Sequence, residues 1–403
     1  MKILFAIGRL TVGGGEKLLV YQLKHLDRNK FEPYLLTLFP EKEESFEREL
    51  RQGLLRETRS LGAWWKQLNF RGLFDFISWF KLYKFLKKEK FDVAVTSLFS
   101  ANLFVRLALL FSGKPKVLIS YEHNIYRDKH RWQIWLDWFL AKFTDKIIVD
   151  AESVKKFTAN QEGIPVDKFL VMHIPPLANA VKIWSFAEDQ ILNAAGDLVL
   201  NADVKVRPPA GGRTLEDIRR ELRIKPDDKV ILTVSRLVEE KGHIYLIRAA
   251  KEVIKNFPNV KFLIVGWGHL EQSLKDEVKK LELENNVKLL GKRDIAEVLP
   301  LAALYIEPAL SVDIGIASME AMAQGLPIIS TNVGEMPVFV KDGENGFLVP
   351  PADSSAMSEK ILTLLKDSEL RKKMGVASRE KVKDFTIEKY MQKFEGIILS
   401  FIK

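Results

Sequence analysis

Two cations stand where a short apolar run gives way to polar residues in the second half of the sequence. Residues 230–234 are followed by Arg236 and, five positions later, by Lys241. A guanidinium grips two phosphate oxygens at once and an ammonium acts as a point charge, so the pair could clamp a diphosphate. The alternative is that both are solvated cations beside Glu239 and Glu240. Spacing alone leaves both interpretations open.

A glycine-rich loop follows the first apolar run of the chain. Gly13, Gly14 and Gly15 stand together before Glu16, where a helical pattern begins. Glycines let backbone N–H groups approach a phosphate, and a helix N-terminus adds partial positive charge. The glycines are contiguous, so they do not match the GxGxxG spacing of dinucleotide sites. The loop indicates a phosphate site, and a plain tight turn is the alternative.

Glu320 is an acidic residue in a segment of small and apolar residues. The segment predicts a helix that begins near Gly315 and ends at Gly325. Burying a carboxylate is costly unless polar groups meet it. Two ribose hydroxyls could meet this one, so Glu320 is a candidate for binding a nucleoside.

These residues need a scaffold, and the chain predicts two parallel sheets. Short β-branched runs alternate with helical patterns, which favours sheets covered by helices on both faces. Such sheets bind ligands at the carboxyl ends of their strands, where the candidate residues lie. The first series of strands is expected at residues 2–7, 31–39, 92–97, 116–120, 144–149 and 169–174, and the second at residues 229–235, 261–265, 287–290, 303–306 and 327–331.

With 403 residues the chain is long enough for two domains. We expect an α/β fold with a first Rossmann-like domain at residues 1–177 and a second at residues 214–384. Residues 178–213 are irregular and rich in proline and glycine, which predicts a linker or insertion. Residues 378–403 predict a helical stretch whose last part, 385–403, packs back on the first domain.

Composition narrows the class of protein. The chain has no cysteine, which excludes disulfides, thiolate catalysis and thiolate metal sites. No apolar stretch approaches the roughly 20 residues of a spanning helix, so we expect a cytoplasmic protein. The net charge of +9 indicates an anionic partner or a lysine-rich solvated surface. Nucleic acid explains the charge poorly, because no recognised binding motif accompanies it.

Five motifs occur in an order that resembles the GT-B retaining glycosyltransferases of family 4, the glycosyl transferases group 1. The motifs are Gly13-Gly14-Gly15-Glu16, Glu122-His123-Asn124, Arg236 with Glu240-Lys241-Gly242, and the runs 320–327 and 342–351. The resemblance covers nearly the whole chain. It implies two Rossmann-like domains facing an interdomain cleft and a nucleoside-diphosphate-sugar donor. No clustered acidic metal site is evident in the sequence, so we expect no metal or other cofactor.

The resemblance also implies roles for the matching residues. Arg236 and Lys241 would hold the donor's diphosphate, and His123 would reach the transferred sugar. The leaving diphosphate would itself help to deprotonate the acceptor, so the protein's task is to stabilise negative charge. The remaining donor-binding residues that the resemblance implies are Gly13, Gly14, Gly15, Glu122, Arg293, Ile295, Asp313, Ile314, Gly315, Ile316 and Glu320.

The chain departs from the family pattern at three acidic positions. Val312, Val338 and Lys182 stand where the family carries carboxylates, and Asp313 would replace the first only if its loop shifts by one residue. A catalytically impaired subunit that binds nucleotide sugar is therefore the alternative function. A nicotinamide oxidoreductase is disfavoured by the spacing of the first glycines and by the lack of a suitably placed acidic residue after the second strand.

Aromatic and basic residues alternate between positions 63 and 91, and a second such cluster lies at residues 129–138. A basic helix with Trp and Phe on its other face suits an anionic membrane surface. The alternative is that the aromatic residues face the domain core while the lysines are solvated. In the resembling enzymes the first domain receives a lipid-linked or polysaccharide acceptor, which favours a peripheral enzyme on the cytoplasmic face of a membrane.

Overall fold

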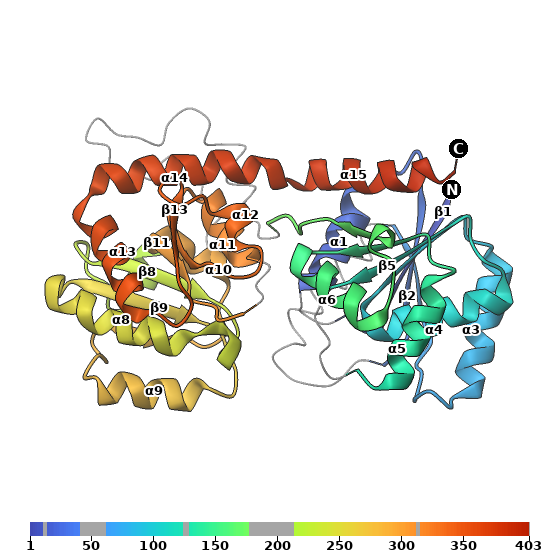
Figure 1. The fold of residues 1–403 in the computed structure, drawn as a ribbon, viewed down its shortest axis with the longest axis horizontal. Helices are drawn as coiled ribbons and strands as arrows, with labels where there is room; N and C mark the ends of the chain where they lie inside the picture. Colours follow the sequence, from blue (N-terminus) through green and yellow to red (C-terminus); the bar gives the residue numbers. More distant parts are fainter. Residues whose placement is uncertain (11–13, 41–61, 124–128, 177–212, 312–314, 403) are drawn as a thin grey trace. The chain divides into compact units, whose positions relative to one another are not determined.

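A computed structural model describes residues 1–10, 14–40, 62–123, 129–176, 213–311 and 315–402. The chain forms two compact units (Figure 1). The first unit is built from Met1–Ile174 together with Ile387–Lys403, and the second from Pro175–Thr386. The expected linker at 178–213 lies almost entirely outside the described residues. Each unit is an α/β layer structure with its own core.

The first unit contains a seven-stranded parallel sheet. Its strand order is β3-β2-β1-β4-β5-β6-β7, so the order reverses between β1 and β4. The edge strand β3 was not expected from the sequence. The strands are β1 (Lys2–Ile7), β2 (Glu32–Thr37), β3 (Trp64–Gln67), β4 (Val93–Ser97), β5 (Val117–Glu122), β6 (Lys146–Val149) and β7 (Phe169–Val171).

Helices cover both faces of this sheet. α3 (Phe76–Glu89), α4 (Leu98–Ser112), α5 (Arg131–Ala141) and α6 (Glu152–Glu162) pack on one face, and α1 (Gly14–His25) and α15 (Ile387–Ser400) on the other. The ring of Phe394 in α15 is fully buried 6.3 Å from the ring of Phe5 in β1. This contact places α15 in the core of the first unit. None of the described helices combines the length and hydropathy needed to span a bilayer.

The second unit contains a six-stranded parallel sheet in the order β10-β9-β8-β11-β12-β13, which reverses between β8 and β11. One core cluster packs α8, α9 and α13 on one face, and another packs α7, α10, α11 and α12 on the other. The strands are β8 (Lys229–Val234), β9 (Val260–Val265), β10 (Val287–Leu289), β11 (Ala302–Glu307), β12 (Ile328–Thr331) and β13 (Gly346–Val349). The helices are α7 (Leu215–Glu221), α8 (His243–Asn256), α9 (Glu271–Lys280), α10 (Ile295–Val298), α11 (Ile316–Ala323), α12 (Met336–Phe339), α13 (Ser354–Lys366) and α14 (Ser368–Val382).

The continuous helical stretch expected at 378–403 is interrupted. α14 ends at Val382, a single 3₁₀ turn covers Lys383–Phe385, and α15 begins at Ile387. The boundary between the two units falls at this interruption. Because of this break, α14 belongs to the second unit and α15 to the first.

Candidate functional site

The loop that carries Arg236 and Lys241 follows β8, at the point where the second sheet reverses its order. A crevice at such a reversal, beyond the carboxyl ends of the strands, is where open α/β sheets bind ligands. The backbone N–H of Leu310, in the loop after β11, donates to the carbonyl of Glu240 at 2.7 Å. The two loops on either side of the reversal are therefore joined. The Arg236 side chain is exposed, and no ion pair links it to another of the described residues.

Gly242 allows this close approach. Its φ is +61°, a left-handed conformation, and a Cβ placed on it would lie 2.1 Å from the carbonyl oxygen of Pro308. Any other residue would push the two loops apart, because that distance is far below a normal contact. The glycine after Lys241 is thus required by packing as well as by backbone conformation.

The side chain of His243 contacts the same loop through its Nε2 atom. Its Nε2 lies 3.0 Å from Ser235 Oγ and 3.1 Å from the Arg236 carbonyl oxygen. A carbonyl only accepts, so Nε2 carries the proton in the tautomer that makes this bond. Burial, together with the nearby charge of Lys241, lowers the pKa of His243 to about 4 despite the hydrogen bond to the Arg236 backbone. A neutral His243 therefore holds the backbone that presents the two candidate phosphate ligands.

The start of α11 supplies backbone N–H groups next to the same loops. Gly315 caps the helix in a left-handed conformation with φ +69°, and a Cβ there would lie 2.9 Å from Met336 Sδ. Ile316 is the first helical residue, and Glu320 lies just over one turn further along with 6% of its surface exposed. The predicted donor-binding residues Asp313 and Ile314, and the divergent Val312, lie outside the described residues.

Arg293 and Ile295 lie at the carboxyl end of the edge strand β10. The guanidinium of Arg293 forms an ion pair with Glu221, and its Nε lies 3.8 Å from Glu297 Oε2. The protein thus holds the side chain through Nη2 and Nε, whereas the buried Nη1 has no hydrogen-bond partner among the described residues. Lys292 stands 4.3 Å over the ring of Trp267, which follows β9 and is half exposed.

In the first unit, the glycine loop leads into α1 beside His123. Gly13 lies outside the described residues, and Gly14 and Gly15 begin the helix. A Cβ on Gly15 would stand 3.0 Å from His123 Cδ2 and 3.3 Å from Nε2. The backbone of the helix start therefore lies against the imidazole edge that carries Nε2. The structure thus brings together the Gly15 and His123 positions that the sequence separated by more than one hundred residues.

The imidazole of His123 is held by Asp150, the residue that follows β6. His123 Nδ1 lies 2.7 Å from Asp150 Oδ2, and both side chains are buried. The ring also stacks on Tyr121 at 5.4 Å. Burial alone would lower the pKa of His123, but the charge of Asp150 and its hydrogen bond outweigh burial and raise it. Because Asp150 occupies Nδ1, Nε2 is the ring atom left for a ligand.

The last helix contributes to the layer beneath His123. The Tyr121 and Tyr390 hydroxyls lie 2.8 Å apart, and Gln22 Nε2 donates to the Tyr121 oxygen at 2.9 Å. Burial raises the pKa of both tyrosines. Residues from α1, β5 and α15 therefore meet in one buried polar group under the imidazole.

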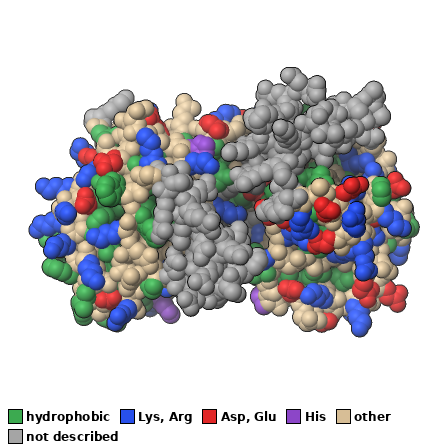
Figure 2. Space-filling view, turned by 180° about the vertical axis from the view of Figure 1, so that it is seen from behind, with side chains coloured by type: hydrophobic (Ala, Val, Ile, Leu, Met, Phe, Trp, Pro, Cys, Tyr) green, Lys and Arg blue, Asp and Glu red, His purple; other side chains and the backbone are tan. Residues whose placement is uncertain are grey.

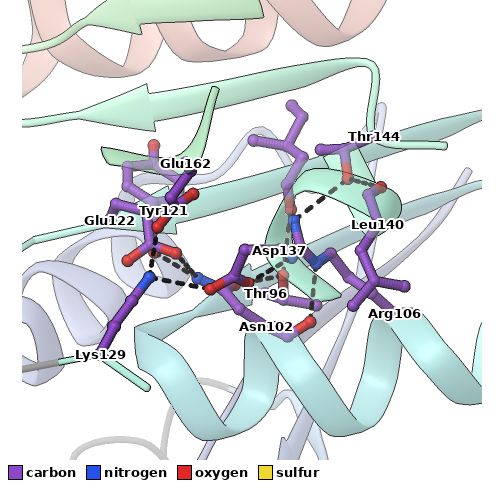
Figure 3. Close-up of polar contacts among 11 residues, drawn as sticks. Thr96, Asn102, Arg106, Tyr121, Glu122, Lys129, Asp137, Leu140, Thr144 and Glu162 are labelled. Carbon is purple, nitrogen blue, oxygen red and sulfur yellow. Dashed lines mark hydrogen bonds and ion pairs between the residues drawn. The ribbon is translucent and has the colours of Figure 1, made fainter. Parts of the chain in front are cut away.

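Glu122 points to the opposite face of the sheet and enters a buried charge cluster (Figure 3). Its Oε1 accepts a hydrogen bond from Asn102 Nδ2 at 2.8 Å. Lys129 Nζ donates to Asp137 at 2.9 Å and also pairs with Glu162. Arg106 Nη2 donates to Asp137 at 3.0 Å. The sequence assigned Glu122 to donor binding, whereas its contacts among the described residues are those of a structural anchor.

This cluster holds more carboxylates than cations, which disfavours the ionised form of its acidic groups. Three carboxylates, of Glu122, Asp137 and Glu162, meet the two cations Arg106 and Lys129. Burial, opposed by Lys129, raises the pKa of Glu162 to about 7, and burial also raises the pKa of Glu122. Glu122 and Lys129 stand close to the two ends of segment 124–128, so the cluster fixes the chain on both sides of it.

Sequence reasoning missed three residues that support the site. His243, Asp150 and Tyr390 contact residues far away in the sequence, and a sequence without homologues carries no signal for such contacts. The only local sign was position: Asp150 directly follows the strand predicted at residues 144–149, and His243 directly follows the motif that ends at Gly242, so both lie near predicted strand ends.

Comparisons with known proteins address the family. Residues 12–174 match the model of the Glycosyltransferase Family 4, and residues 215–381 match the model of the Glycosyl transferases group 1. The chain is a group 1 glycosyltransferase. The matched segments together span both units, so the resemblance drawn from five motifs is confirmed.

Two curated relatives illustrate the similarity of this glycosyltransferase to others. It is 26% identical over 337 residues to the UDP-Gal:alpha-D-GlcNAc-diphosphoundecaprenol alpha-1,3-galactosyltransferase of Escherichia coli, covering 81% of this chain and 80% of that one. It is 30% identical over 193 residues to the N-acetyl-alpha-D-glucosaminyl L-malate synthase of Bacillus anthracis. That second match covers 47% of this chain and about half the length of the relative (50%).

Solved structures confirm the fold of this glycosyltransferase. Anabaena HepE in complex with UDP matches with a TM-score of 0.77 at 19% identity, covering 99% of this chain and 100% of that one. A glycosyltransferase from Rickettsia africae matches with a TM-score of 0.77 at 18% identity, covering 100% and 98%. The chain has the two-domain GT-B fold that the sequence predicted.

Proposed function

We propose that this glycosyltransferase moves a sugar from a nucleoside-diphosphate sugar to a lipid-linked or glycan acceptor, with retention at the anomeric carbon. The observation that carries the proposal is the joined pair of loops at the β8–β11 reversal. These loops present Arg236, Lys241 and the N-terminus of α11 on one edge of one sheet. The HepE structure that shares the fold holds UDP, and the E. coli relative is named for a UDP-sugar and a diphosphoundecaprenol-linked acceptor.

The proposed chemistry requires stabilisation of the leaving diphosphate. Preorganised cations and backbone N–H groups do this best where the loop cannot relax, and the contacts of Gly242 and His243 keep this loop in place. In the first unit, Nε2 of His123 would form a hydrogen bond with the transferred sugar. Glu320 would accept hydrogen bonds from the ribose. We propose that no cofactor or metal joins the donor in this reaction.

The acceptor sets the expected location. A lipid-linked acceptor would place the enzyme at the cytoplasmic face of a membrane, with an anionic membrane surface as a partner and no role for nucleic acid. The E. coli relative's printed name supports this choice, since its acceptor carries a polyprenyl chain.

Binding of UDP and of uridine by calorimetry tests the diphosphate site. Lys241→Ala should weaken UDP binding at least about tenfold, because a hydrogen bond to a charged group contributes about 1.5–3 kcal/mol, while uridine binding stays unchanged. Lys279→Ala, in exposed surface of α9, is the matched control and should leave both unchanged. Equal losses for UDP and uridine would contradict the assignment of Lys241 to the diphosphate.

A catalytically impaired subunit that binds nucleotide sugar is the second candidate. It is motivated by Val338, an exposed apolar residue of α12 where the family carries a carboxylate, and by Val312. Hydrolysis of a panel of nucleotide sugars by the purified protein separates the two. Slow turnover of one donor supports the transferase, whereas tight binding of a donor without turnover, even with an acceptor extract, supports the impaired subunit.

A further inference from the structure

The outer surface of the α3–α4–α5 layer exposes an unusual number of large apolar side chains. Exposed fractions are 77% for Phe76, 65% for Phe80, 75% for Phe111, 50% for Trp132 and 60% for Trp135. Large apolar patches are uncommon on soluble monomers and indicate contact with a partner or a membrane. These five residues and the lysines of α3 are called the aromatic face below.

The aromatic face differs from what the sequence predicted for residues 63–91. Only 76–89 form the helix α3, because Trp64 and Trp65 belong to the edge strand β3. Phe70, Phe85 and Phe91 are buried in the core of the first unit. The segment therefore divides between the two interpretations: part of α3 is a basic helix with exposed Phe side chains, and other aromatic residues face the core.

One side of α3 combines apolar and basic residues. Phe76, Phe80, Lys84 and Lys87 follow each other at helical spacing, so they share one exposed stripe. Leu82, Phe85 and Leu86 form the buried side instead. The sole acidic residue within α3 is Glu89, which forms an ion pair with Lys2 at 3.1 Å. The stripe is therefore apolar in its first half and positively charged in its second.

A hollow lies between α3 and α4 under this stripe. It has a volume of about 400 Å³ and is lined by Phe76, Trp79 and Phe80 from α3 and by Leu107 and Phe111 from α4. In the space-filling view, lysine and arginine side chains lie among hydrophobic ones along the outer edge of the first unit, at the left (Figure 2). The hollow offers space for hydrocarbon, and the surrounding charge suits anionic headgroups.

We propose that the aromatic face binds the surface of an anionic lipid bilayer, with Phe76, Phe80 and Phe111 inserted among the acyl chains. Exposed Trp and Phe beside Lys is the composition of interfacial helices, whereas lysine is depleted in protein–protein interfaces. Lys142, over the ring of Trp138 at 3.6 Å, extends the same composition to the end of α5. This inference rests on the proposed function for its purpose, since a lipid-linked acceptor would lie at that surface.

Flotation of the purified protein with phosphatidylcholine vesicles, with and without phosphatidylglycerol, tests the inference. We expect recruitment by the anionic vesicles that falls as salt rises. The double variant Phe76→Ser/Phe80→Ser should lose at least about tenfold in affinity, since each ring leaves hydrocarbon. The control Val166→Ser/Val376→Ser removes two exposed apolar residues elsewhere and should bind normally.

The charge contribution is tested separately. Near a membrane each lysine contributes about fivefold in affinity, so Lys84→Gln/Lys88→Gln should bind roughly 25-fold more weakly. Lys279→Gln/Lys280→Gln, two exposed lysines at the end of α9, should have no effect. Equal recovery with neutral and anionic vesicles, or unchanged binding of the Phe76→Ser/Phe80→Ser variant, would overturn the proposal. Sedimentation showing self-association that this variant abolishes would also overturn it, because the face would then bind protein.

Donor hydrolysis without vesicles separates this inference from the proposed function. The aromatic-face variants should hydrolyse a nucleotide sugar at the wild-type rate, because none of the changed residues lies at the sheet edges that carry the candidate site. Vesicle binding without any donor turnover would leave the aromatic face supported and refute the transferase. Donor turnover without vesicle binding would support the transferase and refute the membrane-binding role of the aromatic face.

Discussion

Replacing Asp150 by Asn removes the charge that faces His123 and keeps the shape of the side chain. The carboxylate lies 2.7 Å from His123 Nδ1 in a buried setting and raises the pKa of the imidazole. A hydrogen bond to a charged group contributes about 1.5–3 kcal/mol, and one pKa unit corresponds to about 1.4 kcal/mol. The imidazolium should therefore lose about 1.5–3 kcal/mol of stabilisation in the Asp150→Asn protein, which lowers the pKa of His123.

The assay is an NMR titration of protein labelled at its histidine side chains. The chain has six histidines, and a His123→Gln variant identifies the signal of His123. Asp145→Asn is the matched control, since Asp145 pairs with Lys114 and accepts from the Leu118 backbone, away from the imidazole. An unchanged pKa of His123 in Asp150→Asn, or an equal shift in Asp145→Asn, would refute the assignment of Asp150.

The same substitution has a consequence for stability whose sign follows from linkage. A histidine with a raised pKa in the folded state stabilises the fold below its unfolded pKa, and this contribution is lost as the pH rises through the folded pKa. Asp150→Asn should therefore lower the free energy of unfolding more at mildly acidic pH than at alkaline pH. A difference between the two proteins that grows with pH would contradict this reasoning.

Three further substitutions test other features. Gly242→Ala should weaken UDP binding and lower the melting temperature, because its Cβ would meet Pro308, whereas Gly343→Ala, with φ +77° and open space around it, should cost only about 1 kcal/mol. In the wild-type protein, the lowered pKa of His243 should raise the free energy of unfolding by on the order of 3 kcal/mol as the pH increases from 4 to 6.5. The His243→Gln variant should lack this rise. Glu162→Gln should remove a pH dependence of the opposite sign. The pKa of Glu162 is raised to about 7, so its contribution to the free energy of unfolding falls as the pH rises from 4.5 to 7. Denaturant titrations at several pH values measure this free energy, and an unchanged pH dependence in the His243→Gln or the Glu162→Gln protein would refute the corresponding prediction.

Much of the fold was predictable because strand and helix patterns alternate cleanly, and glycines and cations mark strand ends. Eleven strands were expected at or near their observed places, and the loop of Lys241 follows β8 as predicted. The edge strands β3 and β13 were missed. β3 has only four residues, Trp64–Gln67, whose aromatic and basic character indicated a membrane surface instead.

The site was predictable only in part. The sequence placed Arg236 and Lys241 at the carboxyl end of a strand, because that strand directly precedes them. The reversal of the sheet at this strand is a finding of the structure. The pairing of His123 with Asp150 joins residues 27 positions apart, and that of Tyr121 with Tyr390 joins residues 269 apart. Such contacts depend on the order of strands and on where the last helix packs, neither of which a local pattern encodes.

The contribution of α15 to the first unit has a consequence for biosynthesis. The second unit is continuous from Pro175 to Thr386, but the first needs residues 387–400 to cover Phe5 and to bring Tyr390 to Tyr121. A ribosome makes Met1–Ile174 first, yet this part must wait until the second unit has been translated. We expect the nascent first unit to be exposed to proteases and chaperones for that interval, and the polar layer beneath His123 to form last.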